Sequence, residues 1–465
     1  MLRAAGLSRG DRLAILAANR SAYLEAVFAA ARLGAIAVPI NTRLVAREIR
    51  FLLSDCTPRA VLCEAGLEAT VREAALGLAA APAAILGCGG PDDPWERALA
   101  GAGPLDRLEP SGPEDPLLLL YTSGTTGRPK GALLPQRKTL FNSRNAEIFF
   151  RLTRDDRVLV ALPLFHSFGL NILAIPTLYA GGRVVLRRGF DPAAVWEDIG
   201  REGISFFGGV PTMFRALLEA LDAAPKRRDL RSLRFLFTAG AAIPVELIRA
   251  FESRGLVLKQ GFGQTETSIL CCLEAQDAVR KAGSVGRPVT HAELRIVRSA
   301  TLDLPPEQWL DVSSGEAGEI VVRGPIAMLG YWKRPDETAE VLRGEWLRTG
   351  DLATVDGEGF LTLVGRARDL YISGGENVYP AEIEAVYAEH PAVREIAVVG
   401  IPDERWGEVG RAYVVPAPGH RLDPDALREW GRDRLAAFKL PREFVALASL
   451  PRTASGKVQK HRLPV

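Results

Sequence analysis

The chain is poor in the residues that metal centres and disulfide frameworks use. Its 465 residues include only five cysteines and five histidines. The cysteines are odd in number and lack the paired spacing of a zinc site, so we expect no disulfide framework, no zinc and a reducing compartment. These cysteines are Cys56, Cys63, Cys88, Cys271 and Cys272.

Excess charge and long apolar runs are also missing. Lysine and arginine total 58 and acidic residues total 56, so the net charge is +2. This balance does not support binding to nucleic acid or to a membrane surface. The best apolar run, residues 28–40, is interrupted by Arg32 and Gly34 and is shorter than the roughly 18 residues of a membrane helix. Charges near the start argue against a signal peptide, so we expect a soluble, cytoplasmic protein.

The chain does contain enough apolar residues for a folded protein, with 47% hydrophobic and 25% charged composition. Its first hundred residues alternate between apolar runs and helical periodicity, which predicts a parallel α/β sheet. We expect strands at residues 11–18, 35–40 and 60–63, and helices at 21–33 and 48–54.

The remaining chain divides into four further regions. Residues 87–115 are rich in Gly, Pro, Asp and Glu and are interpreted as a surface connection. A second α/β stretch follows at 116–290, and 292–366 has short strands between turn residues. The last hundred residues indicate a compact βαβ-like unit with apolar runs at 396–399 and 412–415.

The most informative segment is residues 117–131, LLLLYTSGTTGRPKG. Its glycines and hydroxyl side chains follow an apolar strand, and such a loop can surround a polyphosphate with backbone and side-chain donors. Lys130 adds a cation, although the spacing differs from the common G-x-x-x-x-G-K-[ST] loop. The predicted phosphate-binding residues are Thr122, Ser123, Gly124, Thr125, Thr126, Gly127 and Lys130.

This segment resembles the phosphate-binding signature of the adenylate-forming (AMP-binding) superfamily, which includes acyl-CoA synthetases, adenylation domains and luciferases. Residues 162–170, LPLFHSFGL, resemble the family's segment beside the acyl pocket. Residues 206–211 and 237–242 place small residues at the ends of apolar strands, where parallel sheets leave a crevice. The resemblance assigns adenine and acyl contacts to Gly240, Ala241 and Ala242. It assigns the acyl pocket to His166, Phe168, Gly169, Phe207, Gly208, Gly209 and Ala239.

A second strong match is GFGQTET at residues 261–267. Mg²⁺ needs a hard oxygen ligand beside the phosphates, and Glu266 supplies one. Thr265 can donate to the α-phosphate, and the resemblance counts Thr265, Glu266 and His166 as catalytic. It also implies ATP contacts from Gly261, Phe262, Gly263 and Gln264.

The C-terminal motifs continue the resemblance. It implies that Asp351 accepts from both ribose hydroxyls, that Arg366 holds the ribose and phosphates, and that Arg368 is the hinge residue. Arg368 is a mild departure, because Lys or Asp is common there in the family. The loop of Ser373, Gly374 and Gly375 would border the CoA channel, and Lys457 would be the catalytic lysine.

The implied fold is a large multi-sheet α/β domain at residues 1–366, a hinge at 367–368 and a mobile α+β domain at 369–465. The first domain is expected to lack the family's usual first strand and helix. The implied enzyme is a carboxylic acid–CoA ligase that uses ATP, Mg²⁺ and coenzyme A. It forms acyl-AMP and pyrophosphate, and then acyl-CoA and AMP after the small domain rotates. Its partners are a small-molecule acid, ATP and CoA, with a homodimer left open.

The acid is less well defined. The pocket segments are apolar and aromatic without Arg or Lys, which disfavours diacids. A medium- or long-chain fatty acid is the favoured interpretation, because the C-terminal half most resembles fatty-acyl-CoA ligases. The alternative is an aryl acid of coumarate, ferulate or benzoate type. A carrier-loading aminoacyl enzyme is less favoured, since residues 166–171 offer no acidic partner for an ammonium.

Two other interpretations share these motifs. A luciferase-like oxidase would be distinguished by oxygen-dependent light output. A non-catalytic relic is disfavoured because Lys130, Glu266, Asp351 and Lys457 are all present.

Overall fold

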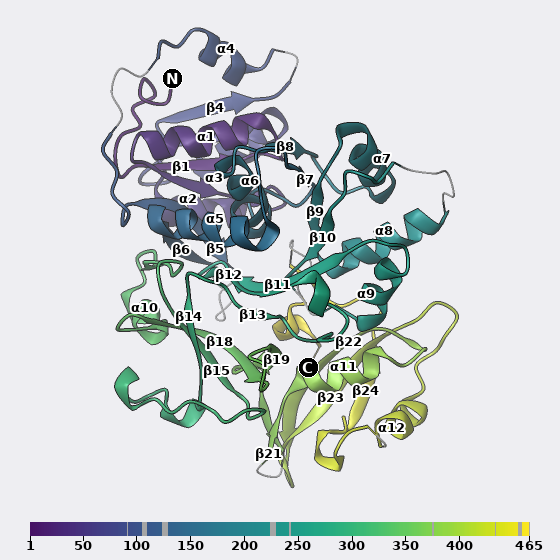
Figure 1. Ribbon diagram of the computed structural model, residues 1–465. Helices are drawn as coiled ribbons and strands as arrows, with labels where there is room; N and C mark the ends of the chain where they lie inside the picture. Colours follow the sequence, from purple (N-terminus) through teal and green to yellow (C-terminus); the bar gives the residue numbers. More distant parts are fainter. Residues whose placement is uncertain are drawn as a thin grey trace. The chain divides into compact units, whose positions relative to one another are not determined.

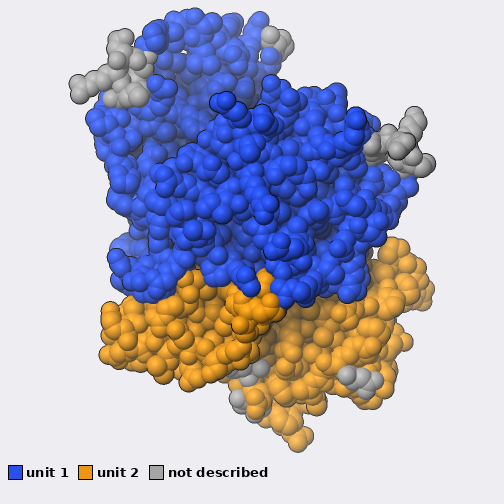
Figure 2. Space-filling view, in the orientation of Figure 1, with its two compact units in different colours: residues 1–293, 322–347 blue, residues 294–321, 348–465 orange. Residues whose placement is uncertain are grey.

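The computed structural model describes residues 1–465 except 91, 105–108, 123–128, 224–228, 241–242, 374–375, 433, 454–457 and 465. Two compact units are formed, which Figure 2 colours separately. Unit 1 contains residues 1–293 and 322–347, and unit 2 contains residues 294–321 and 348–465. Each unit is described by itself.

The first sheet of unit 1 has five parallel strands and two antiparallel strands at one edge (Figure 1). Its order is β16-β6-β5-β2-β1-β3-β4. The strands are β1 (Arg12–Leu16), β2 (Ile36–Pro39), β3 (Ala60–Glu64), β4 (Ala84–Cys88), β5 (Pro116–Thr122), β6 (Lys130–Pro135) and β16 (Gly330–Tyr331). The helices between them are α1 (Ser21–Arg32), α2 (Ala46–Cys56), α3 (Glu68–Ala75) and α4 (Pro94–Ala100).

The second sheet of unit 1 repeats this pairing pattern, again with five parallel strands followed by two antiparallel ones. Its order is β13-β12-β11-β10-β9-β7-β8. The strands are β7 (Arg157–Val160), β8 (Arg183–Leu186), β9 (Phe206–Gly209), β10 (Phe235–Thr238), β11 (Leu258–Gln264), β12 (Ser268–Leu273) and β13 (Arg287–Pro288).

Helices of unit 1 also accompany the second sheet. Helix α5 (Gln136–Phe150) and the π-helix η2 (Phe168–Ala174) both contact β12. The others are α6 (Ile175–Tyr179), α7 (Pro192–Glu202), α8 (Pro211–Ala223) and α9 (Val245–Glu252), while α10 (Pro335–Val341) and β17 (Leu342–Arg343) follow β16.

Apolar runs explain why these segments form a layered core. Strand β1 is buried from Leu13 to Leu16, as expected for a parallel strand covered on both faces. One cluster joins Ala14, Val38 and Val61 of the first sheet to Leu52 and Leu53 of α2. The five elements predicted between residues 11 and 63 are confirmed to within two residues at each end.

One region differs from its prediction. The supposed surface connection at 87–115 contains the end of β4 and the whole of α4. Asp93 caps this helix by accepting from the N–H groups of Trp95 and Glu96, and Pro94 begins its first turn. The buried Trp95 ring anchors the helix. Overall composition conceals such a short helix, whereas the Asp-Pro start signal marks it.

Unit 2 holds most of one sheet and all of another. The first contains β14 (Glu293–Val297), β15 (Gly318–Arg323), β18 (Trp346–Val355) and β19 (Leu361–Arg366). The second has the order β21-β20-β23-β22, with β24 beside β23. Its elements are β20 (Tyr371–Ser373), β21 (Glu376–Val378), α11 (Pro380–Ala388), β22 (Val393–Asp403), β23 (Gly407–Pro416), α12 (Pro424–Arg432) and β24 (Glu443–Ala446).

Two predictions for this region are confirmed. Strands separated by turns form most of residues 292–366, although helix α10 also lies in this range and β18 is ten residues long. Strands β23 and β24 and helix α12 form a parallel βαβ unit. The apolar runs at 396–399 and 412–415 instead pair with each other as an antiparallel hairpin of β22 and β23. The division between the two units falls inside β18, so the predicted hinge at 367–368 stays a prediction.

Candidate active site

Two of the predicted site segments occupy equivalent places in the two sheets of unit 1. The phosphate-loop motif connects β5 to β6, whose register pairs Thr122 with Lys130. The Thr265–Glu266–Thr267 turn connects β11 to β12, whose register pairs Gln264 with Ser268. Both turns follow the carboxyl end of a parallel strand, which is where open α/β sheets bind ligands.

Lys130 and Glu266, which come from different motifs, are brought together around Tyr331. The Tyr331 hydroxyl donates to Glu266 Oε1 at 3.0 Å. Lys130 Nζ lies 5.6 Å from the centre of the Tyr331 ring and 4.0 Å from Glu337 Oε1. The Lys130 side chain is only 14% exposed, so its charge acts in a partly desolvated place.

Five of the predicted phosphate-binding residues lie outside the described residues. They are Ser123, Gly124, Thr125, Thr126 and Gly127. The loop is described only at its two ends, where the Thr122 hydroxyl donates to the Lys130 carbonyl at 3.4 Å.

Hydrogen bonds fix the backbone of the β11–β12 turn on which Glu266 lies. The Gln264 N–H donates to Thr267 Oγ1 at 3.2 Å, and the Met328 N–H donates to the Glu266 carbonyl at 2.9 Å. A Cβ at Gly263 would lie 1.8 Å from the Ser268 carbonyl oxygen, so this close approach requires glycine. Thr265 lies in the same turn and is half-buried.

These groups fit a magnesium ion bound together with ATP. Mg²⁺ in nucleotide sites usually takes one or two carboxylates, substrate phosphates and waters. Glu266 offers a hard carboxylate beside the phosphate-loop lysine, as this pattern requires. No group of three or more metal-binding side chains occurs in the part of the chain that the structure describes.

The predicted acyl segment adopts a π-helix, a form that is common at functional sites. His166 precedes it, and its Nδ1 accepts from the Phe168 N–H at 3.3 Å. The Phe168 ring meets the Phe237 ring edge-on at 5.7 Å between centroids. Gly169 is required by backbone packing, because a Cβ there would lie 2.6 Å from the Pro163 carbonyl oxygen.

At two glycines of the second sheet, neighbouring side chains occupy the space beside the backbone. A Cβ at Gly208 would lie 2.7 Å from the Leu173 side chain, and one at Gly261 would lie 2.5 Å from the Phe237 ring. Gly208 pairs with Phe237, so both belong to the sheet face that contacts Phe168.

Other predicted pocket residues lie elsewhere. Phe207 packs against Phe214 of α8, with 6.1 Å between ring centroids, and therefore lies on the opposite face of the sheet. Gly209 also faces α8, since a Cβ there would lie 3.4 Å from Phe214. The structure does not bring these two together with Phe168. Strand alternation could have separated them from Gly208 in the sequence.

Near the end of β10, Ala239 is buried and Gly240 has a φ of +89°. This φ favours glycine and turns the chain at the edge of the sheet. Phe262 and Gln264 lie half-buried on β11. Ala241 and Ala242 lie outside the described residues.

Unit 2 brings together the two predicted ribose residues. Asp351 of β18 pairs in register with Arg366 of β19, and Arg366 Nε lies 3.1 Å from Asp351 Oδ1. Asp351 is 5% exposed. The adjacent Gly350 has a φ of +69°, and its N–H donates to the carboxylate of the buried Glu319 at 3.3 Å.

The remaining predicted residues of unit 2 are only partly described. Arg368 is exposed beside Asp369, with 3.6 Å between Nε and Oδ1. Ser373 is buried in β20 and pairs with Gly407. Gly374, Gly375 and Lys457 lie outside the described residues.

The described flanks of Lys457 are held at two points. Arg452 and Val458 form an antiparallel bridge. Lys460 lies 2.7 Å from Glu384 of α11. The base of the segment that carries Lys457 is therefore fixed within unit 2.

Several residues at this site were missed by the motif analysis, namely Tyr331, Glu337 and Lys138. Tyr331 lies on a two-residue edge strand, which gives no periodic signal. Lys138 carries a detectable signal, because lysine is rare here and this one lies in a helix that is buried on one side.

Four of the five cysteines are buried, and Cys272 is partly exposed. Burial raises the pKa of Cys56 and of Cys63 to about 12, and it raises the pKa of Cys88, Cys271 and Cys272 as well. At neutral pH these groups are therefore neutral thiols.

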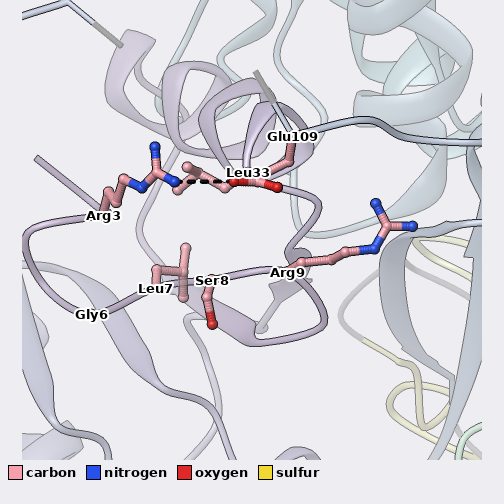
Figure 3. Close-up of a pocket in the computed structure, with 7 residues that line it drawn as sticks. All are labelled: Arg3, Gly6, Leu7, Ser8, Arg9, Leu33 and Glu109. Atoms are coloured by element: carbon pink, nitrogen blue, oxygen red, sulfur yellow. Dashed lines mark hydrogen bonds and ion pairs between the residues drawn. The ribbon is translucent and has the colours of Figure 1, made fainter. Parts of the chain in front are cut away.

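A separate cavity of about 520 Å³ lies near the N-terminus (Figure 3). Arg3 and Glu109 form an ion pair across it at 3.0 Å. None of its lining residues belongs to the predicted site; they are Arg3, Gly6, Leu7, Ser8, Arg9, Leu33 and Glu109. Among the described residues, no helix has the length and apolar character needed to cross a membrane.

Comparison with known proteins identifies the family. The sequence model of the AMP-binding enzyme family matches residues 1–332, and that of the AMP-binding enzyme C-terminal domain matches residues 382–457. The chain therefore belongs to the AMP-binding enzymes, the adenylate-forming superfamily, and to its CoA ligase branch. It is an acid–thiol ligase that forms AMP.

Three similar proteins span nearly the whole chain. Feruloyl-CoA synthase of an Amycolatopsis species is 42% identical over 99% of this chain and 89% of its own length. Indoleacetate–CoA ligase of Aromatoleum aromaticum is 43% identical over the same shares. The crystal structure of ATP-bound MatB from Rhodopseudomonas palustris aligns with a TM-score of 0.89 and 31% identity, over 99% of this chain and 90% of that one. The predicted α/β fold with a smaller C-terminal domain is confirmed.

Proposed function

We propose that the chain is an aryl acid–CoA ligase. The observation that carries this proposal is the packing of one face of the second sheet. Phe168 contacts Phe237 edge-on, and the side chains of Leu173 and Phe237 occupy the space beside Gly208 and Gly261. Related proteins named for ferulate and indoleacetate, both aromatic acids, support the same substrate class. The fatty acid favoured by the sequence alone is therefore replaced by its aryl alternative.

The packing of this face suits a flat ring better than a long chain. A long alkyl chain needs a continuous channel, and Gly208 and Gly261 would be natural places for one. Leu173 and Phe237 occupy that space instead. A planar ring can contact Phe168 and Phe237 through offset or edge-on stacking, which adds about 0.5–1.5 kcal/mol beyond area burial.

Charge on this face agrees with an apolar monocarboxylic acid. Helix η2 and strands β9 and β10 contain no charged residue. The buried Lys259 of β11, which pairs in register with Phe237, is already bonded to Glu274 at 3.0 Å. A second carboxylate or an ammonium on the acid would remain unpaired there, at a cost of several kcal/mol. This argument disfavours diacids and amino acids.

The first step would be adenylate formation. The acid's carboxylate oxygen attacks the α-phosphorus of ATP, and the bond from that phosphorus to pyrophosphate breaks. We propose that Lys130 and the loop before it hold the β- and γ-phosphates, and that Thr265 donates to the α-phosphate. Glu266 would hold Mg²⁺, which neutralises phosphate charge when bound. Asp351 and Arg366 would hold the ribose, and Lys457 would stabilise the developing charge.

The second step would transfer the acyl group to CoA. The thiolate attacks the carbonyl carbon of the acyl-AMP, and the bond to AMP breaks. By the resemblance, Ser373, Gly374 and Gly375 border the path of the thiol after rotation about Arg368. The domain limits, the rotation, the homodimer and the cytoplasmic location all stay predictions.

Product analysis by mass spectrometry tests the proposal. Purified protein is incubated with Mg·ATP and either ferulate, indoleacetate, benzoate, octanoate or palmitate, with and without CoA. We expect aroyl-AMP without CoA and aroyl-CoA with it, with the fatty acids at least tenfold slower. Faster reaction with octanoate or palmitate would overturn the aryl assignment. Adenylate without any CoA product would overturn the ligase assignment.

A further inference from the structure

Helix α5 buries a polar stripe, although the buried face of such a helix is normally apolar. Lys138, Asn142 and Asn145 are 1%, 0% and 2% exposed. They are spaced by four and three residues, so they lie on one face of the helix. Burying three polar side chains is costly unless each makes hydrogen bonds.

The partners of Lys138 and Asn142 lie at the start of β12 and in the acyl segment, whereas Asn145 accepts from the His291 N–H at 3.1 Å. Lys138 Nζ donates to Ser268 Oγ. Asn142 Oδ1 accepts from the Ile269 N–H at 3.2 Å, and its amide donates to the Asn171 carbonyl of η2 at 2.5 Å. The stripe therefore holds β12 two residues after Glu266.

Ser268 needs such a restraint. Its φ is +60°, in the left-handed region that costs a residue with a Cβ roughly 1–2 kcal/mol. This conformation closes the turn that presents Glu266. If Ser268 relaxed, the direction of the turn and the position of the Glu266 carboxylate would change with it.

Charge supports the same connection. Burial lowers the pKa of Lys138 to about 7, and the nearby Glu266 opposes that shift while Arg137 adds to it. The hydrogen-bond partner of Lys138 among the described residues is a neutral hydroxyl. A lysine that served packing alone could be replaced by an apolar residue at little cost.

We propose that Lys138 is a positioning residue for adenylation: through Ser268 it fixes the β11–β12 turn so that Glu266 is placed to bind Mg²⁺ with ATP. Asn142 assists by holding the next residue of β12 and linking it to the acyl segment. This inference rests on the proposed role of Glu266. Groups that orient metal ligands from outside typically change metal affinity or activity by about 10- to 100-fold.

The test compares Lys138→Met and Lys138→Gln with Lys259→Met. Lys259 is a matched control, because it is also a buried lysine, 7% exposed, but it lies on β11 and pairs with Glu274 and the Phe149 carbonyl. Two quantities are measured on the whole chain without any acid: the melting temperature, and the Mg²⁺ concentration that gives half of the ATP-induced rise in melting temperature. The KM for Mg·ATP and kcat are then measured with ferulate.

We expect Lys138→Met to raise the Mg²⁺ requirement at least tenfold. Lys138→Gln should partly restore it, because its amide can still donate to Ser268. Lys259→Met should lower the melting temperature and leave the Mg²⁺ requirement within twofold. The inference is wrong if folded Lys138→Met keeps the wild-type requirement, or if Lys259→Met raises it equally.

Ser268→Ala covers the case in which Lys138→Met does not fold. It removes the hydroxyl without placing a new group in the core, and it should raise the Mg²⁺ requirement in the same direction; an unchanged requirement would overturn the inference. The readouts also separate this inference from the proposed function. Wild-type protein that binds Mg·ATP but activates no aryl acid contradicts the substrate class alone, whereas protein that binds no Mg·ATP contradicts both.

Discussion

The two sheets of unit 1 share one pairing pattern but differ in strand order. Each contains five parallel strands, and the strand that pairs with the fifth is antiparallel to it. The parallel part reads β5-β2-β1-β3-β4 in the first sheet and β11-β10-β9-β7-β8 in the second. Despite this difference, both sheets place a site segment in the hairpin after the fifth strand. The position of the site therefore follows from the change of strand direction, and not from one order of connections.

The two hairpins also differ in what holds them. Near the first, Asp55 of α2 accepts from the Tyr121 hydroxyl at 2.6 Å and from Arg334 at 3.0 Å, and its backbone carbonyl accepts from the Trp332 indole. Near the second, Lys138 of α5 donates to Ser268. A titratable side chain from a neighbouring helix is used in both places, an acidic one at the first hairpin and a basic one at the second. The difference shows that a hairpin can be fixed by either an acceptor or a donor.

The largest expected effect comes from removing the chemistry of the second hairpin. Glu266→Gln keeps the size and shape of the side chain but removes the charge that we assign to Mg²⁺. We expect kcat for pyrophosphate release with ferulate to fall at least about 100-fold. Glu274→Gln, at the far end of the same hairpin, is the control and should remain within threefold. Equal losses in the two variants would remove the special role of Glu266.

We expect that only the second sheet lines the acyl pocket. Two leucine variants, one beside each sheet, can check this expectation. Leu173→Ala opens space above Gly208, while Leu53→Ala opens space in the core of the first sheet. Both should lose about 2–5 kcal/mol of unfolding free energy in urea denaturation. Only Leu173→Ala should also raise kcat/KM for octanoate relative to ferulate, by about tenfold. A similar change in Leu53→Ala would show that selectivity follows stability and not the pocket.

Asp55→Ala sharpens the comparison by removing the support of the first hairpin. It leaves the Tyr121 hydroxyl and the Arg334 guanidinium without their acceptor, and the Asp55 side chain is only 10% exposed. We expect a loss of about 1–3 kcal/mol in unfolding free energy, together with a higher KM for ATP. Asp222→Ala breaks a more exposed pair with Arg254, at 51% and 34% exposure, and should cost under about 1 kcal/mol. Equal losses would mean that Asp55 supports nothing beyond its own ion pair.

The smallest expected effect is a pH dependence of the unfolding free energy, which arises from Lys138 beside the second hairpin. Burial lowers the pKa of Lys138 to about 7 in the folded chain, whereas a lysine in the unfolded chain titrates near 10.4. Between these values the unfolded chain binds more protons, so the unfolding free energy rises with pH. Relative to Lys138→Met, the wild-type chain should gain at most about 1.4 kcal/mol per pH unit above pH 7. Denaturation at pH 7.5 and 8.5 measures this; parallel curves for the two proteins would contradict it.

Local signals in the sequence were sufficient for many elements. The apolar runs of β1 and β2 and the periodicity of α1 predict those elements nearly to the residue. The glycine- and hydroxyl-rich motif after β5 marks a phosphate loop, because few other structures need that composition. The resemblance assigned Asp351 and Arg366 to the ribose, and the structure brings these two side chains into contact in unit 2.

Contacts between distant segments could not be predicted in this way. Tyr331 reaches Glu266 from an edge strand that is only two residues long, and Lys138 reaches Ser268 from a helix that precedes it by 130 residues. The residues of the π-helix at Phe168–Ala174 do not distinguish it from an ordinary α-helix. The segment packs against α5 and β12, which are distant in the sequence.

The buried cysteines have a consequence for the handling of a reactive product. An acyl-adenylate transfers its acyl group to thiolates, so any ionised cysteine of the protein would compete with the CoA thiol. Burial keeps all five thiols protonated near neutral pH. We therefore expect no cysteine thiolate of the chain to compete with CoA for this intermediate at neutral pH.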